Sequence, residues 1–198
     1  MRHSMIALAM AAAGLGAVTL AHEAAAQGNA GWVTLFDGKN LNNWDKVGDA
    51  NWRIADGAVQ ADAGKGGFLV TKNPYKDFQI RAEVWVDDDA NSGIFIRCSD
   101  PKMIGGMTCY EVNIFDKRPD PSYGTGAIVN VAKVNPMPRA GGKWNVMEIE
   151  AKGPVFNITF NGIQTVKGAR DDRHPAGVFA LQYGAGIVKF RKVEVHPL

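Results

Sequence analysis

The feature that most restricts the fold of this chain is alternation: nearly every regular segment switches between apolar and polar residues with a period of two. The alternating segments are residues 78–86, 93–97, 110–115, 144–150, 156–160, 178–182 and 188–195. Period-two alternation is typical of β-strands with one buried face, whereas an amphipathic helix repeats every 3.6 residues. The sequence therefore predicts an all-β protein.

Turn-forming pairs separate these segments. They are Asp37-Gly38, Asp56-Gly57, Gly153-Pro154 and Asn161-Gly162. Short strands with regular turns and no interleaved helices predict an antiparallel sandwich or barrel. Two longer loops, 103–108 and 117–138, interrupt the strands, and long loops on a rigid sheet are common places for binding groups.

The first residues are typical of a secretion signal. Arg2 and His3 precede an apolar run over residues 5–20, and a small-residue site follows at Ala24-Ala25-Ala26. We expect residues 1–26 to be a signal peptide that directs the protein to the periplasm or outside the cell, with an N-terminal membrane anchor as the alternative. Residues 31–198 are then enough for one domain.

Charge and cysteine content restrict the partners. The net charge is +2, and no basic run or second long apolar stretch follows. Neither nucleic acid nor a membrane span in the mature chain is indicated. Cys98 and Cys109 are the two cysteines, and in an exported protein they favour a disulfide over two buried free thiols. Strict alternation, however, would send their side chains to opposite faces of the sheet.

Several segments, in order, resemble the 3-keto-disaccharide hydrolase family. They are GWVTLFDGKNLNNW at 31–44, WRIADG at 52–57, NSGIFIR at 91–97, YEVNIFD at 110–116, TGAI at 125–128, WNVMEI at 144–149, NG at 161–162 and LQ at 181–182. The resemblance implies a concanavalin-like jelly-roll β-sandwich. It also implies action on a small carbohydrate, a glycoside whose sugar has a ketone at carbon 3.

The alternation places candidate catalytic groups on one face. Val112 and Ile114 form the inward set of their strand, which leaves Glu111 and Asn113 on the other side, and Arg97 is expected beside them on the neighbouring strand. A ketone at carbon 3 acidifies the hydrogen on carbon 2, so Glu111 is expected to remove this proton. Arg97 or a divalent metal would stabilise the enolate, after which the aglycone leaves and water adds. The alternative is that Arg97 and Glu111 form a structural ion pair.

Other candidates complete the expected site. His174 is a loop residue that could reach the cleft as a second catalytic group. Gln182, Asp116 and Trp144 are expected to bind the sugar together with Asn113, by hydrogen bonds and aromatic stacking. The acidic turn 87–89, with Asn91, could bind calcium, but a solvated turn is the favoured interpretation.

A non-catalytic function stays open. Members of the family often have His-Gly after Leu-Gln and Tyr-Gly after Thr-Gly-Ala-Ile, where this chain has Tyr183-Gly184 and Val129-Asn130. The alternative to an enzyme is therefore a lectin-like carbohydrate-binding module.

Overall fold

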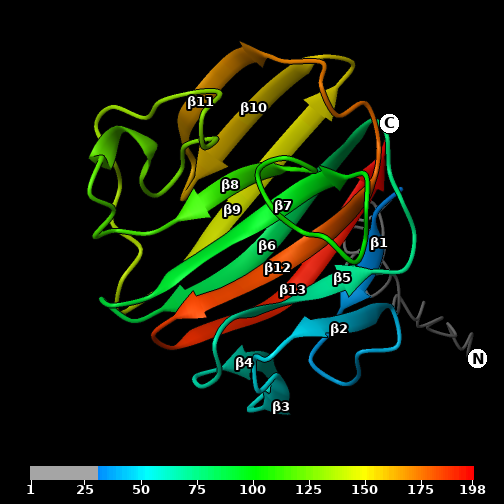
Figure 1. The fold of residues 1–198 in the computed structure, drawn as a ribbon, viewed down its shortest axis with the longest axis vertical. Helices are drawn as coiled ribbons and strands as arrows, with labels where there is room; N and C mark the ends of the chain where they lie inside the picture. Colours follow the sequence, from blue (N-terminus) through cyan, green and yellow to red (C-terminus); the bar gives the residue numbers. More distant parts are fainter. Residues whose placement is uncertain (1–30) are drawn as a thin grey trace, which may run out of the picture. The chain divides into compact units, whose positions relative to one another are not determined.

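Two antiparallel β-sheets, packed face to face, account for most of the chain (Figure 1). The computed structural model describes residues 31–198, and the expected signal peptide, residues 1–26, lies outside the described residues. Residues 31–198 contain no helix long and apolar enough to cross a membrane.

The large sheet has eight strands in the order β11-β10-β9-β6-β13-β4-β3, and β1 pairs with β13 beside this path. Its strands are β1 (Val33–Phe36), β3 (Arg53–Ala55), β4 (Ala58–Ala61), β6 (Phe78–Val86), β9 (Trp144–Lys152), β10 (Val155–Phe160), β11 (Ile163–Arg170) and β13 (Val188–Pro197).

The small sheet has five strands in the order β2-β5-β12-β7-β8. They are β2 (Trp44–Gly48), β5 (Gly67–Thr71), β7 (Asn91–Cys98), β8 (Tyr110–Ile114) and β12 (Val178–Ala185). The named elements of the described chain include one short 3₁₀ turn, η2 (Pro121–Tyr123), in the long link between β8 and β9. The predicted antiparallel sandwich is confirmed.

The alternation seen in the sequence becomes the core between the sheets. In β6, Phe78, Ile80, Ala82, Val84 and Val86 are buried, and the residues between them are half-buried on the outer face. Burial of each large apolar side chain contributes roughly 1.5–3 kcal/mol, so the many such residues facing the interior hold the two layers together.

Hairpin turns also follow the sequence. Asn161 and Gly162 both have positive φ between β10 and β11, and Asp56 and Gly57 do the same between β3 and β4. A two-residue turn with both φ angles positive matches the twist of the strands it joins, and Asn-Gly and Asp-Gly are favoured there.

Candidate active site

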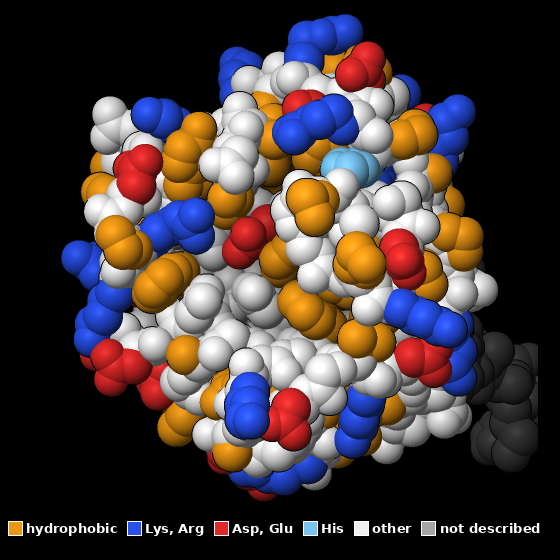
Figure 2. Space-filling model, viewed as in Figure 1, with side chains coloured by type: hydrophobic (Ala, Val, Ile, Leu, Met, Phe, Trp, Pro, Cys, Tyr) orange, Lys and Arg blue, Asp and Glu red, His pale blue; other side chains and the backbone are white. Residues whose placement is uncertain are grey.

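The outward face of the small sheet is hollowed. Figure 2 shows a depression on the side of the molecule that Figure 1 presents, with hydrophobic and charged side chains along its rim. The loop between β7 and β8, residues 99–109, lies across this face, and the long link from β8 to β9 lies beside it (Figure 1). Residues 126–129 pair with the free edge of β8: Asn113 N donates to Ala127 O at 3.0 Å and Val129 N to Glu111 O at 2.9 Å. The paired strands of the small sheet form the floor of this depression, and we call the depression the hollow.

Strand register places four polar or aromatic side chains around one glycine. Gly93 of β7 pairs with Gln182 on one side and Asn113 on the other. One row along the same face, Phe95 pairs with Glu111. Because side chains two residues apart on a strand share a face, Gln182, Asn113, Phe95 and Glu111 surround the bare backbone of Gly93.

Gly93 makes this arrangement close. A β-carbon at this position would lie 2.9 Å from Val112 O and 3.4 Å from Gln182 Oε1. A side chain would therefore push against β8 and also fill the space in front of the strand. With glycine, a ligand can approach the backbone directly.

Two side-chain oxygens beside Gly93 are buried and have no hydrogen-bond partner among residues 31–198. They are Asn113 Oδ1 and Gln182 Oε1. Asn113 Nδ2 donates to Tyr123 O at 2.7 Å, which fixes the orientation of that amide. A buried polar group without a partner costs about 1–3 kcal/mol. A ligand whose hydroxyl groups donate to these two oxygens would remove this cost on binding.

Glu111 is half-buried, and none of the salt bridges within residues 31–198 includes it. Burial raises the pKa of its carboxyl above the ordinary value, and the positive charge of Arg118 partly opposes this shift. A carboxylate with a raised pKa is a stronger base than an ordinary glutamate, and it exchanges protons closer to neutral pH. Glu111 is thus a half-buried carboxyl of raised pKa that forms no salt bridge within residues 31–198.

The other half of the hollow is apolar. Its buried members are Val70, Phe95, Cys98, Cys109, Val178 and Ala180, and the half-buried Val47, Phe68 and Ile104 pack against them. Phe68 meets Phe95 edge to face, with ring centroids 5.3 Å apart. Cys98 and Cys109 form the expected disulfide, which ties the end of β7 to the start of β8.

A β-bulge explains how the disulfide forms. Between Val178 and Ala180 the register of β12 advances by two residues, while β7 advances by three, from Cys98 to Phe95. Arg97 is the extra residue, with a positive φ of 52°. The bulge breaks the strict alternation, so Cys98 comes to the same face as Phe95 and meets Cys109.

The same bulge overturns the expected role of Arg97. Its side chain turns away from the hollow and is 1% exposed. It donates from Nε to Lys76 O at 2.8 Å, from Nη1 to Gly153 O at 2.7 Å and from Nη2 to Asp77 Oδ1 at 3.1 Å. The prediction that Arg97 shares a face with Glu111 is wrong, and the ion pair between them is not formed because Arg97 pairs with Asp77.

His174 lies on the other side of β8. Its ring meets that of Tyr110 at 4.9 Å, and its backbone N–H donates to the Tyr110 hydroxyl at 3.0 Å. Tyr110 faces the core, whereas the next residue, Glu111, faces the hollow. Burial lowers the pKa of His174. The structure therefore does not bring His174 and Glu111 together.

Asp116 holds two loops rather than facing open space. Its carboxylate accepts from Thr125 Oγ1 at 2.6 Å and from the backbone N–H groups of Ala140 and Gly141 at 2.9 and 3.0 Å. Trp144 lies on the outer face of the large sheet, where the Arg191 guanidinium is 3.9 Å from its ring centroid. Of the expected binding residues, the structure brings Asn113 and Gln182 together beside Glu111, but not Trp144.

Three residues of the hollow are not among the predicted site residues: Gly93, Phe95 and Phe68. The alternation of residues 93–97 already put Phe95 on the face of Glu111, so its side was readable. The proximity of Phe68 and Gly93 to Gln182 depends on β5 and β7 both pairing with β12. Nothing local in the sequence indicates that pairing.

Metal ligands do not cluster within the described part of the chain. Residues 31–198 contain no group of three or more His, Cys, Asp or Glu side chains that could hold a metal ion. The acidic turn 87–89 accordingly does not gather such a set; Asp89 pairs with Lys117 there.

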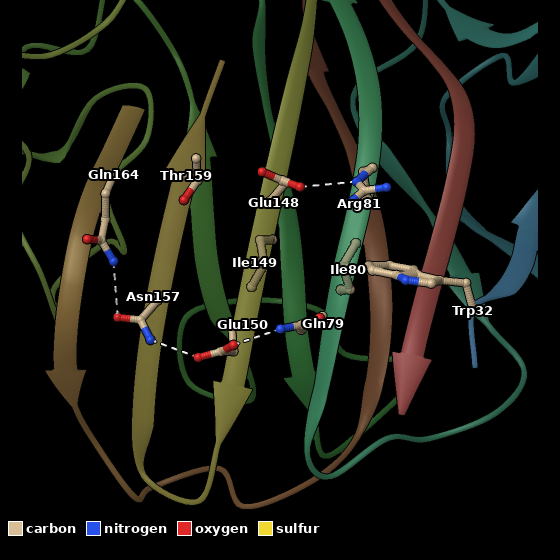
Figure 3. A pocket seen from close by; sticks show the side chains of 10 residues that line it. All are labelled: Trp32, Gln79, Ile80, Arg81, Glu148, Ile149, Glu150, Asn157, Thr159 and Gln164. Atoms are coloured by element: carbon tan, nitrogen blue, oxygen red, sulfur yellow. Dashed lines mark hydrogen bonds and ion pairs between the residues drawn. The ribbon is translucent and has the colours of Figure 1, made fainter. Parts of the chain in front are cut away.

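A second depression, of ≈ 420 Å³, lies on the outer face of the large sheet (Figure 3). Its polar side chains bind one another. Gln79 and Asn157 donate to the two oxygens of Glu150 at 2.8 and 2.9 Å, and Arg81 pairs with Glu148 at 3.1 Å. The Arg81 guanidinium also lies over the Trp32 ring, 4.9 Å from its centroid. These polar side chains therefore have their hydrogen-bond and ion-pair partners within the same face.

An antiparallel sandwich with a hollow on its smaller sheet defines a β-sandwich of the lectin and glucanase type. The chain belongs to the 3-keto-alpha-glucoside-1,2-lyase-like domain family, whose model matches residues 31–196. Over 77 residues it is 35% identical to the 3-keto-disaccharide hydrolase of Bacteroides thetaiotaomicron; the match covers 33% of this chain and 27% of that hydrolase.

Solved structures share the fold. A protein of Parabacteroides distasonis designated a glycosyl hydrolase superposes with a TM-score of 0.73 at 18% identity, covering 91% of this chain and 98% of that one. The carbohydrate-binding module CBM66 of Bacillus subtilis gives a TM-score of 0.57 at 16% identity, covering 83% and 94%. The Bacillus licheniformis β-glucanase gives 0.58 at 11% identity, covering 85% and 98%.

Proposed function

We propose that this protein cleaves glycosides whose sugar is a ketone at carbon 3, and that it does so in the hollow of the small sheet. Membership of the family supports the substrate class. The observation that supports the site most is the position of Glu111, a half-buried carboxyl of raised pKa one row from two unpartnered acceptors around Gly93.

In this proposal the sugar ring lies over Gly93. Its hydroxyl groups donate to Asn113 Oδ1 and Gln182 Oε1, which fixes the ring and offsets the burial of both oxygens. Phe95, opposite Glu111 in the pairing, contributes an apolar surface for a C–H face of the ring.

Glu111 then takes the proton from carbon 2, and the electron pair of that C–H bond forms the enolate of the carbon-3 ketone. The enolate collapses, the bond between carbon 1 and the aglycone oxygen breaks, and a double bond forms between carbons 1 and 2. Water adds across this bond, so the net reaction is hydrolysis. Arg118, whose charge acts on Glu111, replaces Arg97 as the candidate for stabilising the negative enolate.

The test is release of a chromogenic aglycone from a 3-keto-glucoside and from its unoxidised parent. We expect release from the oxidised substrate alone, because the parent lacks an acidic hydrogen on carbon 2. Release from both substrates would indicate an ordinary glycosidase. Binding of both without release would favour the lectin-like module instead.

We also propose that the protein works in the periplasm or outside the cell. The apolar run at residues 5–20 and the small-residue site at 24–26 support export. The disulfide between Cys98 and Cys109 is of the kind that persists in oxidising compartments. N-terminal sequencing of the protein from fractionated cells should give Gln27 as the first residue, and an unprocessed cytoplasmic chain with free thiols would refute the proposal.

A further inference from the structure

The apolar half of the hollow has no task in removing the carbon-2 proton. It is nevertheless continuous with the catalytic half through the strand pairing. Phe68 pairs with Gln182, and Val70 and Phe95 flank Ala180. A sugar ring over Gly93 would therefore have this apolar surface beside it, within reach of a group attached to the ring.

The accessible part of this surface is aromatic and firmly held. Phe68 and Val47 are half-buried, and the edge-to-face contact with Phe95 fixes the Phe68 ring. The loop above them is anchored at its base by the Cys98–Cys109 disulfide, and inside it Thr108 Oγ1 donates to Gly105 O at 3.2 Å. A prearranged apolar surface loses little conformational entropy when a ligand binds.

Two exposed methionines lie on either side of Ile104 in the loop between β7 and β8. Ile104 packs on the apolar cluster, and Met103 and Met107, in the same loop, are 58% and 88% exposed. Methionine side chains are flexible and adapt to ligands of different shape. Figure 2 shows hydrophobic side chains along the rim of the hollow.

This side of the hollow offers little to a second sugar. The unpartnered acceptors that border the hollow, Asn113 Oδ1 and Gln182 Oε1, both lie beside Gly93. Among the residues of the two paired rows, the carboxylate on the apolar side is Asp45, which is exposed beyond Val70 at the outer edge. Gln182 Oε1 turns toward Gly93 rather than toward Phe68, so a sugar bound over Phe68 would lose water from its hydroxyl groups without gaining this acceptor.

We propose that the leaving group of the substrate is an apolar, aromatic alcohol, bound over Phe68 and Val47, rather than a second sugar. The inference rests on the proposed function. In the reaction, Glu111 takes the carbon-2 proton, the electron pair of the bond from carbon 1 to oxygen goes to the departing phenolic oxygen, and water later adds across carbons 1 and 2. An aromatic ring gains from burial against Phe68 both through apolar area and through ring–ring contact.

The test compares KM for a 3-keto phenyl glucoside with KM for a 3-keto disaccharide, in the wild type and in Phe68→Ala. We expect the wild-type KM to be about tenfold lower for the phenyl glucoside, the effect of burying part of one aromatic ring. Phe68→Ala should remove this difference by raising KM for the phenyl glucoside alone. An equal rise for both substrates, or an equal or lower wild-type KM for the disaccharide, would overturn the inference.

Two controls separate this inference from the proposed function. Ile163→Ala removes a hydrophobic side chain that is 65% exposed on the large sheet, and it should leave both KM values unchanged. Calorimetric binding of unoxidised phenyl and methyl glucosides needs no catalysis, and Val47→Ser tests the same surface if Phe68→Ala does not fold. Tighter binding of the phenyl glucoside, lost in the variant, would support the subsite even if no 3-keto substrate were cleaved, whereas equal binding of the two glucosides would refute it.

Discussion

Glu111 and Glu150 both extend from the outward face of a sheet, and their surroundings differ. Glu150, on the large sheet, accepts hydrogen bonds from Gln79 and Asn157, and these bonds lower its pKa. Burial raises the pKa of Glu111, and beside Gly93 on the same face lie two oxygens with no hydrogen-bond partner among residues 31–198. Polar groups that bind each other stabilise a surface, whereas buried groups without partners are available to a ligand.

The largest expected effect is on the reaction itself. Glu111→Gln keeps the shape of the side chain but removes the base, so kcat for a 3-keto-glucoside should fall roughly 10²–10⁴-fold. KM and the melting temperature should change little. The matched change on the large sheet, Glu150→Gln, should leave kcat unaltered. A Glu111→Gln enzyme with wild-type turnover would rule out Glu111 as the base.

The next largest expected effect is a loss of stability when Arg97 is substituted. Arg97→Met removes a buried guanidinium that pairs with Asp77 and bonds two backbone carbonyls. We expect the free energy of unfolding to fall by about 3 kcal/mol. Denaturant unfolding measures this loss, while kcat of the folded variant stays within a few-fold of wild type. Loss of kcat without loss of stability would return Arg97 to the catalytic groups.

The pH dependence of activity and of stability provides a further test of Glu111. Glu111 must be ionised to act, so kcat/KM should rise about tenfold per pH unit up to its raised pKa and then level off. Because the folded state binds this proton more tightly than the unfolded chain, Glu111 should reduce stability as the pH rises from its unfolded pKa through its folded pKa. Glu111→Gln should remove both dependences, and a kcat/KM profile unchanged by this substitution would contradict the assignment.

The smallest expected effects compare two glutamines. The amide oxygen of Gln182 has no partner among residues 31–198, whereas the amide of Gln79 donates to Glu150. Gln182→Met keeps the length of the side chain but removes the acceptor, so KM should rise about tenfold with no loss of melting temperature. Gln79→Met removes a donor to Glu150 and should cost less than about 1 kcal/mol of stability with no change in KM. Equal effects of the two substitutions on KM would mean that the hollow is not the binding site.

Alternation along single strands was enough to predict the sandwich and to place Glu111 and Asn113 on one face. It failed at Arg97, because one inserted residue reverses the direction of every following side chain and nothing in the local sequence marks the insertion. The disulfide was predicted correctly from the number of cysteines. The bulge at Arg97 brings Cys98 to the face where it meets Cys109, which strict alternation would not allow.

Contacts between strands that are far apart in the sequence could not be predicted from it. Trp144 was expected in the site, but it lies on the outer face of the large sheet, because which sheet receives β9 depends on its pairing with β6 and β10. His174 was expected to reach the cleft, and it packs on Tyr110 instead. Pairing between segments far apart in the chain is set by packing of the whole core, which no single segment encodes.

Hydrogen exchange at carbon 2 tests the central claim most directly. The enzyme is incubated in heavy water with a chromogenic 3-keto-glucoside, and NMR measures deuterium at carbon 2 of the released sugar. Removal of this proton by Glu111, followed by addition of water, predicts deuterium at carbon 2 of the sugar released by the wild type, and it predicts that release and exchange both slow roughly 10²–10⁴-fold with Glu111→Gln. Release of the sugar with its original hydrogen at carbon 2 would contradict the account.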